Sequence, residues 1–389
     1  MRPHHPPVLI LGGGLMGLAV AHQLARRGAS VLVLSRRRSE AAGFVAAGML
    51  APHAEGIGGA LLRLGQASLQ RIPAWVAEIE ADSDLACGLR PCGIVVPFTN
   101  ATERDGYATA AWGTALDRSG LEREIPGIGP RWRAGLLFEQ DGQIDNRRRL
   151  MRALERACVQ RGVQFEEGSE VLELITSHGE TSAAPAPVSA ARSAAPARAA
   201  HPARLEAVRL RRADGSELEL PCRTAVLAGG AWSARLLPQL PVVPVKGQML
   251  SLQGPIGALP RVVFGPGTYL VPREDGLLVV GATSEPEAGF SEGLTPCGQR
   301  QLEQGIAALL PAASHWPPME RWWGFRPCTP DEGPLLGPGP IGGLWLATGH
   351  HRNGVLLAAL SADLVARGIS GEPSPGDGEQ LEAFRWDRF

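Results

Sequence analysis

The hydrophobic and polar positions at the start of the chain change from a strand pattern to a helical one and back. Residues 8–11 form a short continuous apolar run, which is typical of a buried strand, and residues 15–27 carry apolar side chains at helical spacing. The segment ASVLVLS, residues 29–35, follows Gly28 as a second apolar run. This order predicts a strand, a helix and a second strand, which together make a βαβ unit.

Similar patterns return later in the chain. Residues 145–162 have an amphipathic helical pattern, residues 163–174 favour strands, and residues 224–232 (TAVLAGGAW) indicate a buried strand that ends in glycines. Residues 344–368 place a buried strand, a His-Arg-Asn-Gly turn and a long helix in succession. We therefore expect an α/β domain assembled from segments that lie far apart in the sequence.

Two regions depart from this pattern. Between residues 241 and 320, β-branched residues alternate or cluster between Gly and Pro turns, which predicts an antiparallel sheet facing a site and a second domain. Residues 177–203 are rich in Ala, Pro, Ser and Arg and nearly lack large apolar side chains, so they bury too little surface to offset the cost of ordering. We expect this segment to be a disordered surface insertion.

Composition narrows the class of protein. The 389 residues allow two domains, because single cores usually stop growing beyond roughly 250–300 residues. A formal net charge of −1 gives no basic field for nucleic acid or a membrane surface, so a small-molecule partner is expected. The six cysteines form no C-x-x-C pair, which argues against a disulfide framework and a zinc site and favours reduced thiols in a cytoplasmic protein. No apolar run approaches the roughly 18 residues of a membrane helix.

A glycine motif lies between the first strand and the first helix. In LGGGLMG, Gly12, Gly14 and Gly17 satisfy the pattern G-x-G-x-x-G. The first glycine permits a tight turn, the second lets the backbone approach a pyrophosphate, and the third allows close packing of helix and strand. Since the helix N-terminus also stabilises phosphates, the segment predicts a dinucleotide site.

The second strand ends unusually for such a site. An acidic residue normally stands there and accepts hydrogen bonds from a ribose diol, but VLVLSRRRSE, residues 31–40, has Ser35 followed by Arg36 and two further arginines. In nicotinamide enzymes this arrangement accommodates a 2′-phosphate, which would favour NADP and a reductase. Alternatively, the arginines are a solvated loop and the serine makes a weaker ribose contact. The run alone does not decide between them.

Several longer motifs are more specific. They are AAGMLAPHAE, VKGQML, TYLVPREDGLLVVGAT, RWWGFRPCTPDEGPLLG and ATGHHRNGVLLA, which begin at residues 46, 245, 268, 321 and 347. In this order and spacing they resemble the D-amino-acid oxidase superfamily, most closely the FAD-dependent glycine oxidases of thiamine (thiazole) biosynthesis. The resemblance runs from residue 8 to about 385, interrupted by the Ala/Pro-rich segment.

The resemblance implies a fold and a cofactor. A Rossmann-like FAD-binding domain would comprise residues 1–85, 141–240 and 320–389, and an antiparallel-sheet substrate-binding domain would comprise residues 86–140 and 241–319. FAD would then replace NADP as the ligand of the first βαβ unit. Related sarcosine oxidases tether FAD through a cysteine, but that position aligns near Gly324 and not at Cys328, so noncovalent FAD is expected.

The resemblance also assigns residues to the cofactor. The N–H groups of the helix that begins near Val355 would face the pyrimidine edge of the flavin, where negative charge builds on reduction. No proton chemistry is expected of the two adjacent histidines. The residues expected to contact FAD are Gly12, Gly14, Leu15, Met16, Gly17, Ser35, Arg36, Ala47, Gly48, Met49, Val171, His350, His351, Arg352, Asn353, Gly354, Val355 and Leu356.

Three further matches concern the substrate. Arg326 matches the arginine that binds the substrate carboxylate, Tyr269 a tyrosine that assists it, and Arg352 a second arginine near the site. A planar guanidinium suits this role because it binds both carboxylate oxygens. Gly267 and Ser284 stand where relatives carry a histidine and a pocket methionine, which leaves the preferred amine open.

The activity implied by the resemblance is oxidation of glycine or another small amino acid by FAD and dioxygen. The products would be hydrogen peroxide and an imine that hydrolyses or feeds thiazole formation, with a thiazole synthase as a pathway partner. Alternatives of the same fold are an amine or D-amino-acid dehydrogenase, with another electron acceptor, and a sarcosine oxidase. A flavoprotein without turnover is a different class. The sequence leaves the oligomeric state open, and a homo-oligomer is compatible with it.

Overall fold

The computed structural model describes residues 7–177 and 203–389. Its first layer is a six-stranded sheet. All neighbouring strands in this sheet run parallel except β19 and β20 at one edge, which are antiparallel. In spatial order the strands are β19 (Leu335–Pro338), β20 (Leu344–Thr348), β13 (Ala225–Leu227), β1 (Val8–Leu11), β2 (Val31–Ser35) and β9 (Gln164–Glu167). The sheet thus joins strands from both ends of the chain.

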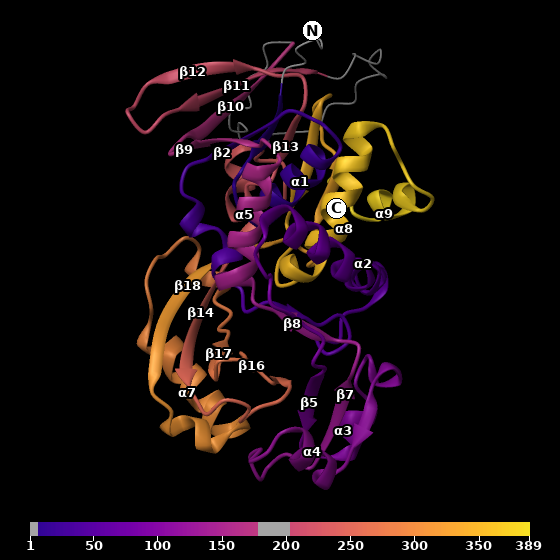
Figure 1. The fold of residues 1–389 in the computed structure, drawn as a ribbon, viewed down its shortest axis with the longest axis vertical. Coiled ribbons are helices and arrows are strands. Elements are labelled where there is room, and N and C mark those ends of the chain that lie inside the picture. Colours follow the sequence, from indigo (N-terminus) through magenta and orange to yellow (C-terminus); the bar gives the residue numbers. More distant parts are fainter. Residues whose placement is uncertain (1–6, 178–202) are drawn as a thin grey trace, which may run out of the picture.

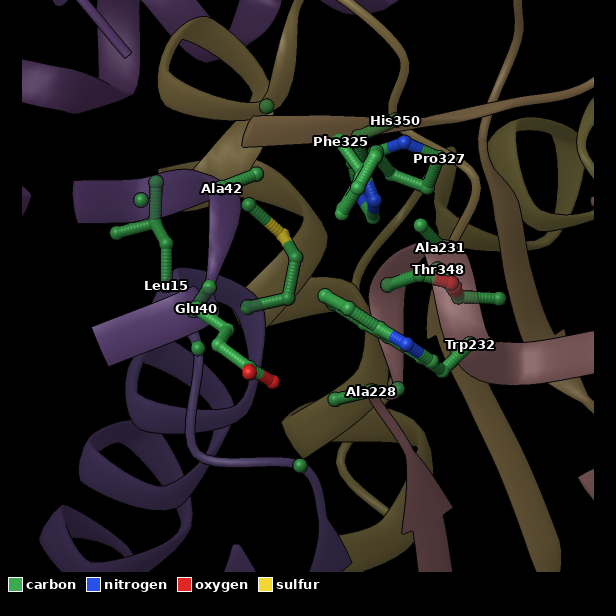
Figure 2. A pocket seen from close by; sticks show the side chains of 18 of the residues that line it. Leu15, Glu40, Ala42, Ala228, Ala231, Trp232, Phe325, Pro327, Thr348 and His350 are labelled. Atoms are coloured by element: carbon green, nitrogen blue, oxygen red, sulfur yellow. The ribbon is translucent and has the colours of Figure 1, made fainter. Parts of the chain in front are cut away.

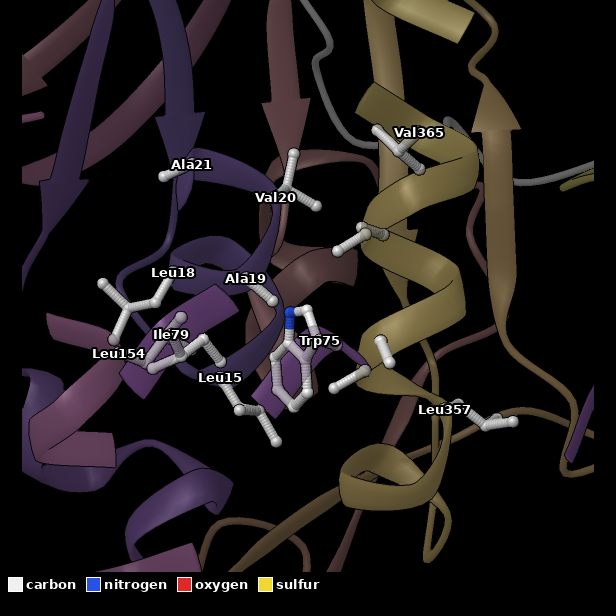
Figure 3. Packing of buried hydrophobic residues seen from close by; sticks show 14 of the residues in the cluster. Leu15, Leu18, Ala19, Val20, Ala21, Trp75, Ile79, Leu154, Leu357 and Val365 are labelled. Atoms are coloured by element: carbon white, nitrogen blue, oxygen red, sulfur yellow. The ribbon is translucent and has the colours of Figure 1, made fainter. Parts of the chain in front are cut away.

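Helices cover one face of this sheet. They are α1 (Leu15–Arg26), α2 (Gly59–Ser83), α5 (Met151–Gln160) and α8 (Gly354–Ser370), whose apolar sides share one buried cluster. Figure 3 shows Trp75 of α2 beside α8 and close to Ala19 of α1, and Trp75 is 1% exposed. Because α8 contacts both α1 and α2, it fixes the position of the loop just before it.

A smaller sheet covers the other face. It is the antiparallel meander β10 (Glu170–Thr176), β11 (Leu205–Arg211) and β12 (Glu217–Pro221), drawn at the top of Figure 1. Leu174, Val208 and Leu210 pack with Leu9 and Leu227 of the central sheet. The central strands are therefore buried on both faces, which explains why they are continuous apolar runs.

The lower half of Figure 1 contains an eight-stranded sheet. All its neighbouring strands are antiparallel except the pair β15 and β5. In spatial order they are β18 (Pro318–Cys328), β14 (Val243–Gln253), β17 (Leu277–Gly281), β16 (Thr268–Pro272), β15 (Val262–Gly265), β5 (Ile94–Phe98), β7 (Ala134–Phe138) and β6 (Thr114–Leu116). Helices α3 (Ala101–Asp105), α4 (Arg118–Glu124) and α7 (Pro296–Leu309) pack against it, and α7 shares an apolar cluster with β14, β16 and β17.

Short elements complete the chain. A small sheet of β3 (Met49–Leu50), β8 (Gly142–Ile144) and β4 (Leu89–Arg90) lies between the two large sheets, with β8 at its centre in Figure 1. Helices α6 (Ser233–Leu236) and α9 (Asp377–Ala383) follow β13 and α8. None of the helices in the two described stretches is long and apolar enough to span a membrane.

The predicted fold class is confirmed. The first βαβ unit, the strand before the His-Arg-Asn-Gly turn and the helix after it all occur as expected. The 25-residue helix α2 was not predicted from the sequence, because Pro73 and the interior Gly65 hide its helical pattern. The domain boundaries remain a prediction, but β18 continues the eight-stranded sheet to Cys328, so this sheet does not end at residue 319.

The predicted insertion, residues 177–203, lies outside the described residues except for its two ends. There the backbone N–H of Ser177 donates to the carbonyl of Arg204 at 2.9 Å, so the two ends are adjacent. We expect that a short Gly/Ser turn in place of residues 178–202 closes the β10–β11 hairpin and leaves FAD content and turnover nearly unchanged. Flavin absorbance per protein and kcat would test this, and a large loss of either would show that the segment has another role.

Candidate active site

A long cavity begins at the carboxyl ends of β1, β2 and β13 and extends to the eight-stranded sheet. Figure 2 shows Leu15, Glu40, Ala228 and Trp232 around part of it. The turn between β1 and α1 forms one wall, and Gly12 has φ of +123°, a conformation that favours glycine. A Cβ on Gly17 would collide with the Gly12 carbonyl, so the third glycine sets the packing of helix and turn, as predicted.

The first turn of α1 faces the cavity. Gly14, the residue before the helix, and Leu15 and Met16 line it, and no side chain caps the helix start. The unpaired N–H groups of a helix start and the positive end of its dipole favour an anion. This geometry fits the pyrophosphate of a dinucleotide.

The arginine run after β2 is fully paired. Arg36 contacts Glu40 at 2.9 Å and Glu170 at 3.5 Å, and Arg37 contacts Glu40 at 3.0 Å. Arg38 contacts Glu155 at 2.7 Å and Glu167 at 2.5 Å. Since each guanidinium already has a carboxylate partner, the run offers no free cation for a 2′-phosphate, and the NADP interpretation loses its physical basis.

The segment at residues 46–49 approaches the middle of the cavity with little side-chain bulk. Ala47, Gly48 and Met49 all line it. Gly48 has φ of +83°, and a Cβ there would collide with the Ile144 carbonyl of β8. Only glycine therefore fits between the cavity and the small sheet.

The two histidines before α8 are neutral at pH 7. Burial lowers the pKa of His350 to about 3, and burial together with the charges of Arg326 and Arg352 lowers that of His351 to about 4. His350 Nε2 lies 3.1 Å from the Ser361 hydroxyl, while its buried Nδ1 has no partner in the described protein. No side chain caps α8 either, so this end of the cavity also presents unsatisfied polar groups.

The buried histidine makes stability depend on pH. Between pH about 6.5 and pH about 3 the unfolded state protonates this imidazole and the folded state does not, so stability should fall as the pH falls through this window. We expect His350→Asn to lower the slope of stability against pH there. Urea unfolding of the holoprotein from pH 4 to pH 7 would test this, and equal slopes in both proteins would contradict it.

At the far end of the cavity, Arg326 of β18 and Tyr269 of β16 come together. Arg326 Nη1 donates to the Thr283 carbonyl at 3.0 Å, and its guanidinium lies directly over Gly247 of β14. Tyr269 lies over Gly281, its cross-strand partner on β17. Burial raises the pKa of the tyrosine hydroxyl, and the neighbouring arginine charges oppose this effect. Two glycines thus make room for the two side chains.

The second arginine has a partner that sequence reasoning missed. Arg352 Nη2 lies 3.3 Å from Glu55, whose side chain is 7% exposed. Burial raises the pKa of Glu55, and the charges of Arg352 and Arg326 partly oppose it. The turn carrying Glu55 is held by Asp141, which accepts from the backbone N–H of Ala54 at 2.8 Å. Of two arginine charges at this end, one is therefore balanced.

Most of the residues predicted to form the site line this one cavity. Three do not: Gly17 packs α1 on the turn, Asn353 is buried before α8, and Leu356 belongs to the helical core. Their assignment as cofactor contacts has no support from the cavity lining. Gly267 and Ser284 are exposed and do not line it either, so they do not set its volume. Lining residues that sequence reasoning did not name include Gly13, Glu40, Glu55, Ala228, Gly229, Trp232, Arg235 and Thr348.

The comparisons with known proteins decide the family. The model of the family described as FAD dependent oxidoreductase matches residues 7–367. The chain belongs to this family. As FAD is its cofactor, the glycine turn, the uncapped helix starts and the unpartnered His350 Nδ1 are the features here that fit FAD. Cys328 does not line the cavity and Gly324 does, which agrees with noncovalent FAD.

Individual proteins of this family are similar to the chain over most of its length. The chain is 41% identical over 367 residues to the bifunctional protein ThiO/ThiG of Synechocystis sp., which covers 92% of this chain and 51% of the relative. It is 29% identical to a glycine oxidase of Geobacillus kaustophilus, over 93% of this chain and 92% of the relative. The crystal structure of glycine oxidase from the same organism superposes with a TM-score of 0.84 at 27% identity, over 99% of both chains. The chain spans about half the length of its bifunctional relatives.

Proposed function

We propose that this protein is a glycine oxidase, which oxidises glycine or another small amino acid with FAD and dioxygen and forms hydrogen peroxide. The observation that carries the proposal is the position of Arg326 in the cavity without a carboxylate partner in the described part of the chain. Its guanidinium lines the cavity beside Tyr269, and within the described residues it has no carboxylate in salt-bridge distance. A largely buried cation without a counter-ion is stabilised by an anionic ligand.

The side chains suggest how an amino acid would bind. The Arg326 fork binds both carboxylate oxygens, and the Tyr269 hydroxyl donates to one of them. Arg352 is paired with Glu55, so the pocket keeps about one net positive charge, which matches one substrate carboxylate. Anchored in this way, the amino acid has few orientations left, and its Cα is held toward the cofactor.

The remaining chemistry belongs to the cofactor. Bound FAD would accept the hydride from the substrate Cα and pass the electrons to dioxygen. The neutral histidines 350 and 351 hold no proton to give at pH 7, so the protein's part is to bind and orient the substrate. Released imine would hydrolyse to glyoxylate or supply thiazole formation.

The bifunctional relatives also suggest a partner and a setting. Since those relatives are named as bifunctional ThiO/ThiG proteins, we propose a thiazole synthase as the pathway partner of this chain. All six cysteines are free, which fits a reducing cytoplasm. A homo-oligomer remains a prediction.

One experiment separates the candidate activities. The purified holoprotein is mixed without oxygen with glycine, sarcosine, D-alanine or D-proline, and bleaching of the flavin absorbance is followed. Fastest bleaching by glycine, with peroxide formed once air is admitted, is expected. Bleaching without peroxide in air would favour a dehydrogenase with another acceptor, faster bleaching by sarcosine would favour a sarcosine oxidase, and no bleaching by any amine would favour a protein without turnover.

A further inference from the structure

The ribose end of the cavity has an unusual acceptor. Ser35, at the end of β2, lines the cavity and is 6% exposed. An acid at this point of a dinucleotide site normally accepts hydrogen bonds from the ribose diol. A serine hydroxyl is a neutral and therefore weaker acceptor than a carboxylate. The ribose thus lacks its usual charged partner on this strand.

Glu40, five residues after Ser35, places a carboxylate at the same cavity. Glu40 closes the short 3-10 turn Arg38–Glu40, and its side chain lines the cavity together with Ser35 and the glycine turn. Figure 2 shows the carboxylate of Glu40 extending from this segment into the space between Leu15 and Ala228. Its side chain is 22% exposed, so solvent reaches it only in part.

The arginine run fixes this carboxylate. Arg36 holds one oxygen at 2.9 Å and Arg37 the other at 3.0 Å. A carboxylate oxygen has more than one acceptor site, so each still accepts a hydroxyl. In the sequence these arginines resemble a phosphate-binding site, but in the structure they hold the Glu40 carboxylate in place.

The other two acidic residues that line the cavity are less suitable as hydrogen-bond acceptors for the ribose. Glu55 lies at the substrate end, paired with Arg352. Glu170 also lines the cavity, but its side chain is 42% exposed and lies 3.5 Å from Arg36. This leaves Glu40 as the shielded carboxylate near the end of β2.

We propose that Glu40 accepts the hydrogen bond from the adenosine ribose of FAD that the acid at position 35 would otherwise accept. The proposed contact depends on Ser35, the arginine run and the turn together. The same carboxylate would disfavour NADP, since a 2′-phosphate would meet its negative charge.

The test measures binding instead of turnover. The dissociation constant of FAD is obtained by equilibrium dialysis of the holoprotein, and ADP and 2′-deoxy-ADP are then compared as competitors of FAD. In the wild type, ADP should compete better than 2′-deoxy-ADP. Glu40→Gln should weaken FAD binding by about tenfold and abolish the preference for ADP, because a charged acceptor becomes a neutral one.

Glu170→Gln is the matched control, since it removes the other cavity carboxylate that contacts Arg36, and it should keep the preference for ADP. Loss of this preference in Glu170→Gln and not in Glu40→Gln would overturn the proposal. So would unchanged or tighter FAD binding by Glu40→Gln, as expected if its charge lay against the pyrophosphate. Weaker FAD binding with the ADP preference retained would assign Glu40 to another contact and also overturn it.

Restoring an acid at position 35 gives an independent check. Ser35→Glu added to Glu40→Gln should recover FAD affinity and the preference for ADP. If Glu40→Gln does not fold, Glu40→Asp replaces it, because the shorter side chain keeps the charge and loses reach, and the same loss of ADP preference is required. An Asp variant that discriminates like the wild type would contradict the assignment.

Discussion

Arg326→Ala is expected to reduce kcat/KM for glycine by about 30-fold to about 5,000-fold while FAD remains bound. Breaking a buried, hydrogen-bonded charge pair from one side costs roughly 2–5 kcal/mol, and each 1.36 kcal/mol is about tenfold in rate. Arg326→Lys keeps the charge but loses the planar fork, so it should still lower kcat/KM strongly. Steady-state kinetics with glycine, beside the flavin spectrum of each variant, would measure both effects.

Arg352→Ala is the natural comparison, because Arg352 lines the same cavity but is already paired with Glu55. It should have the smaller effect on KM for glycine. Near-wild-type efficiency in Arg326→Ala, with a severe loss in Arg352→Ala, would exchange the roles of the two arginines. Loss of flavin from Arg326→Ala would mean instead that β18 supports the cofactor.

Much of the fold could be predicted because its signals are local. The glycines at positions 12, 14 and 17 act within a few residues of one another, and their motif is meaningful only between a strand and a helix, both of which appear as apolar patterns. The turn before α8 is likewise followed directly by its helix. Such elements need no knowledge of distant residues.

The parts that could not be predicted depend on contacts between distant segments. Glu55 occurs in a motif noted in the sequence, but its role follows from Arg352, which the fold brings beside it from before α8. Glu40 resembles a solvated acid until its two arginine contacts and the cavity are known. The edge strand β18 carries polar residues and tryptophans without clear alternation, so only its pairing with β14 shows where it belongs.

Those pairings also indicate how the substrate end keeps its shape. Val245 of β14 lies opposite Arg326 of β18, and Gly247 lies opposite Gly324, so the arginine side chain crosses the bare backbone of Gly247. A larger residue at position 247 would occupy the place of the guanidinium. The glycine is therefore expected to be as important for substrate binding as the arginine itself.

Gly247→Ala should lower kcat/KM for glycine by about 100-fold. The methyl group would displace the Arg326 guanidinium, and misplacing a positioning group by about 1 Å can lower the rate by about 100-fold. The added methyl would meet the guanidinium end of the Arg326 side chain and not backbone, so the variant should fold and keep FAD. In an Arg326→Ala background the same change should add little, since the group it displaces is absent. Kinetics of the two single variants and the double variant, with the flavin spectrum of each, would measure this coupling. Additive losses would mean that Gly247 acts on the substrate directly and not through Arg326.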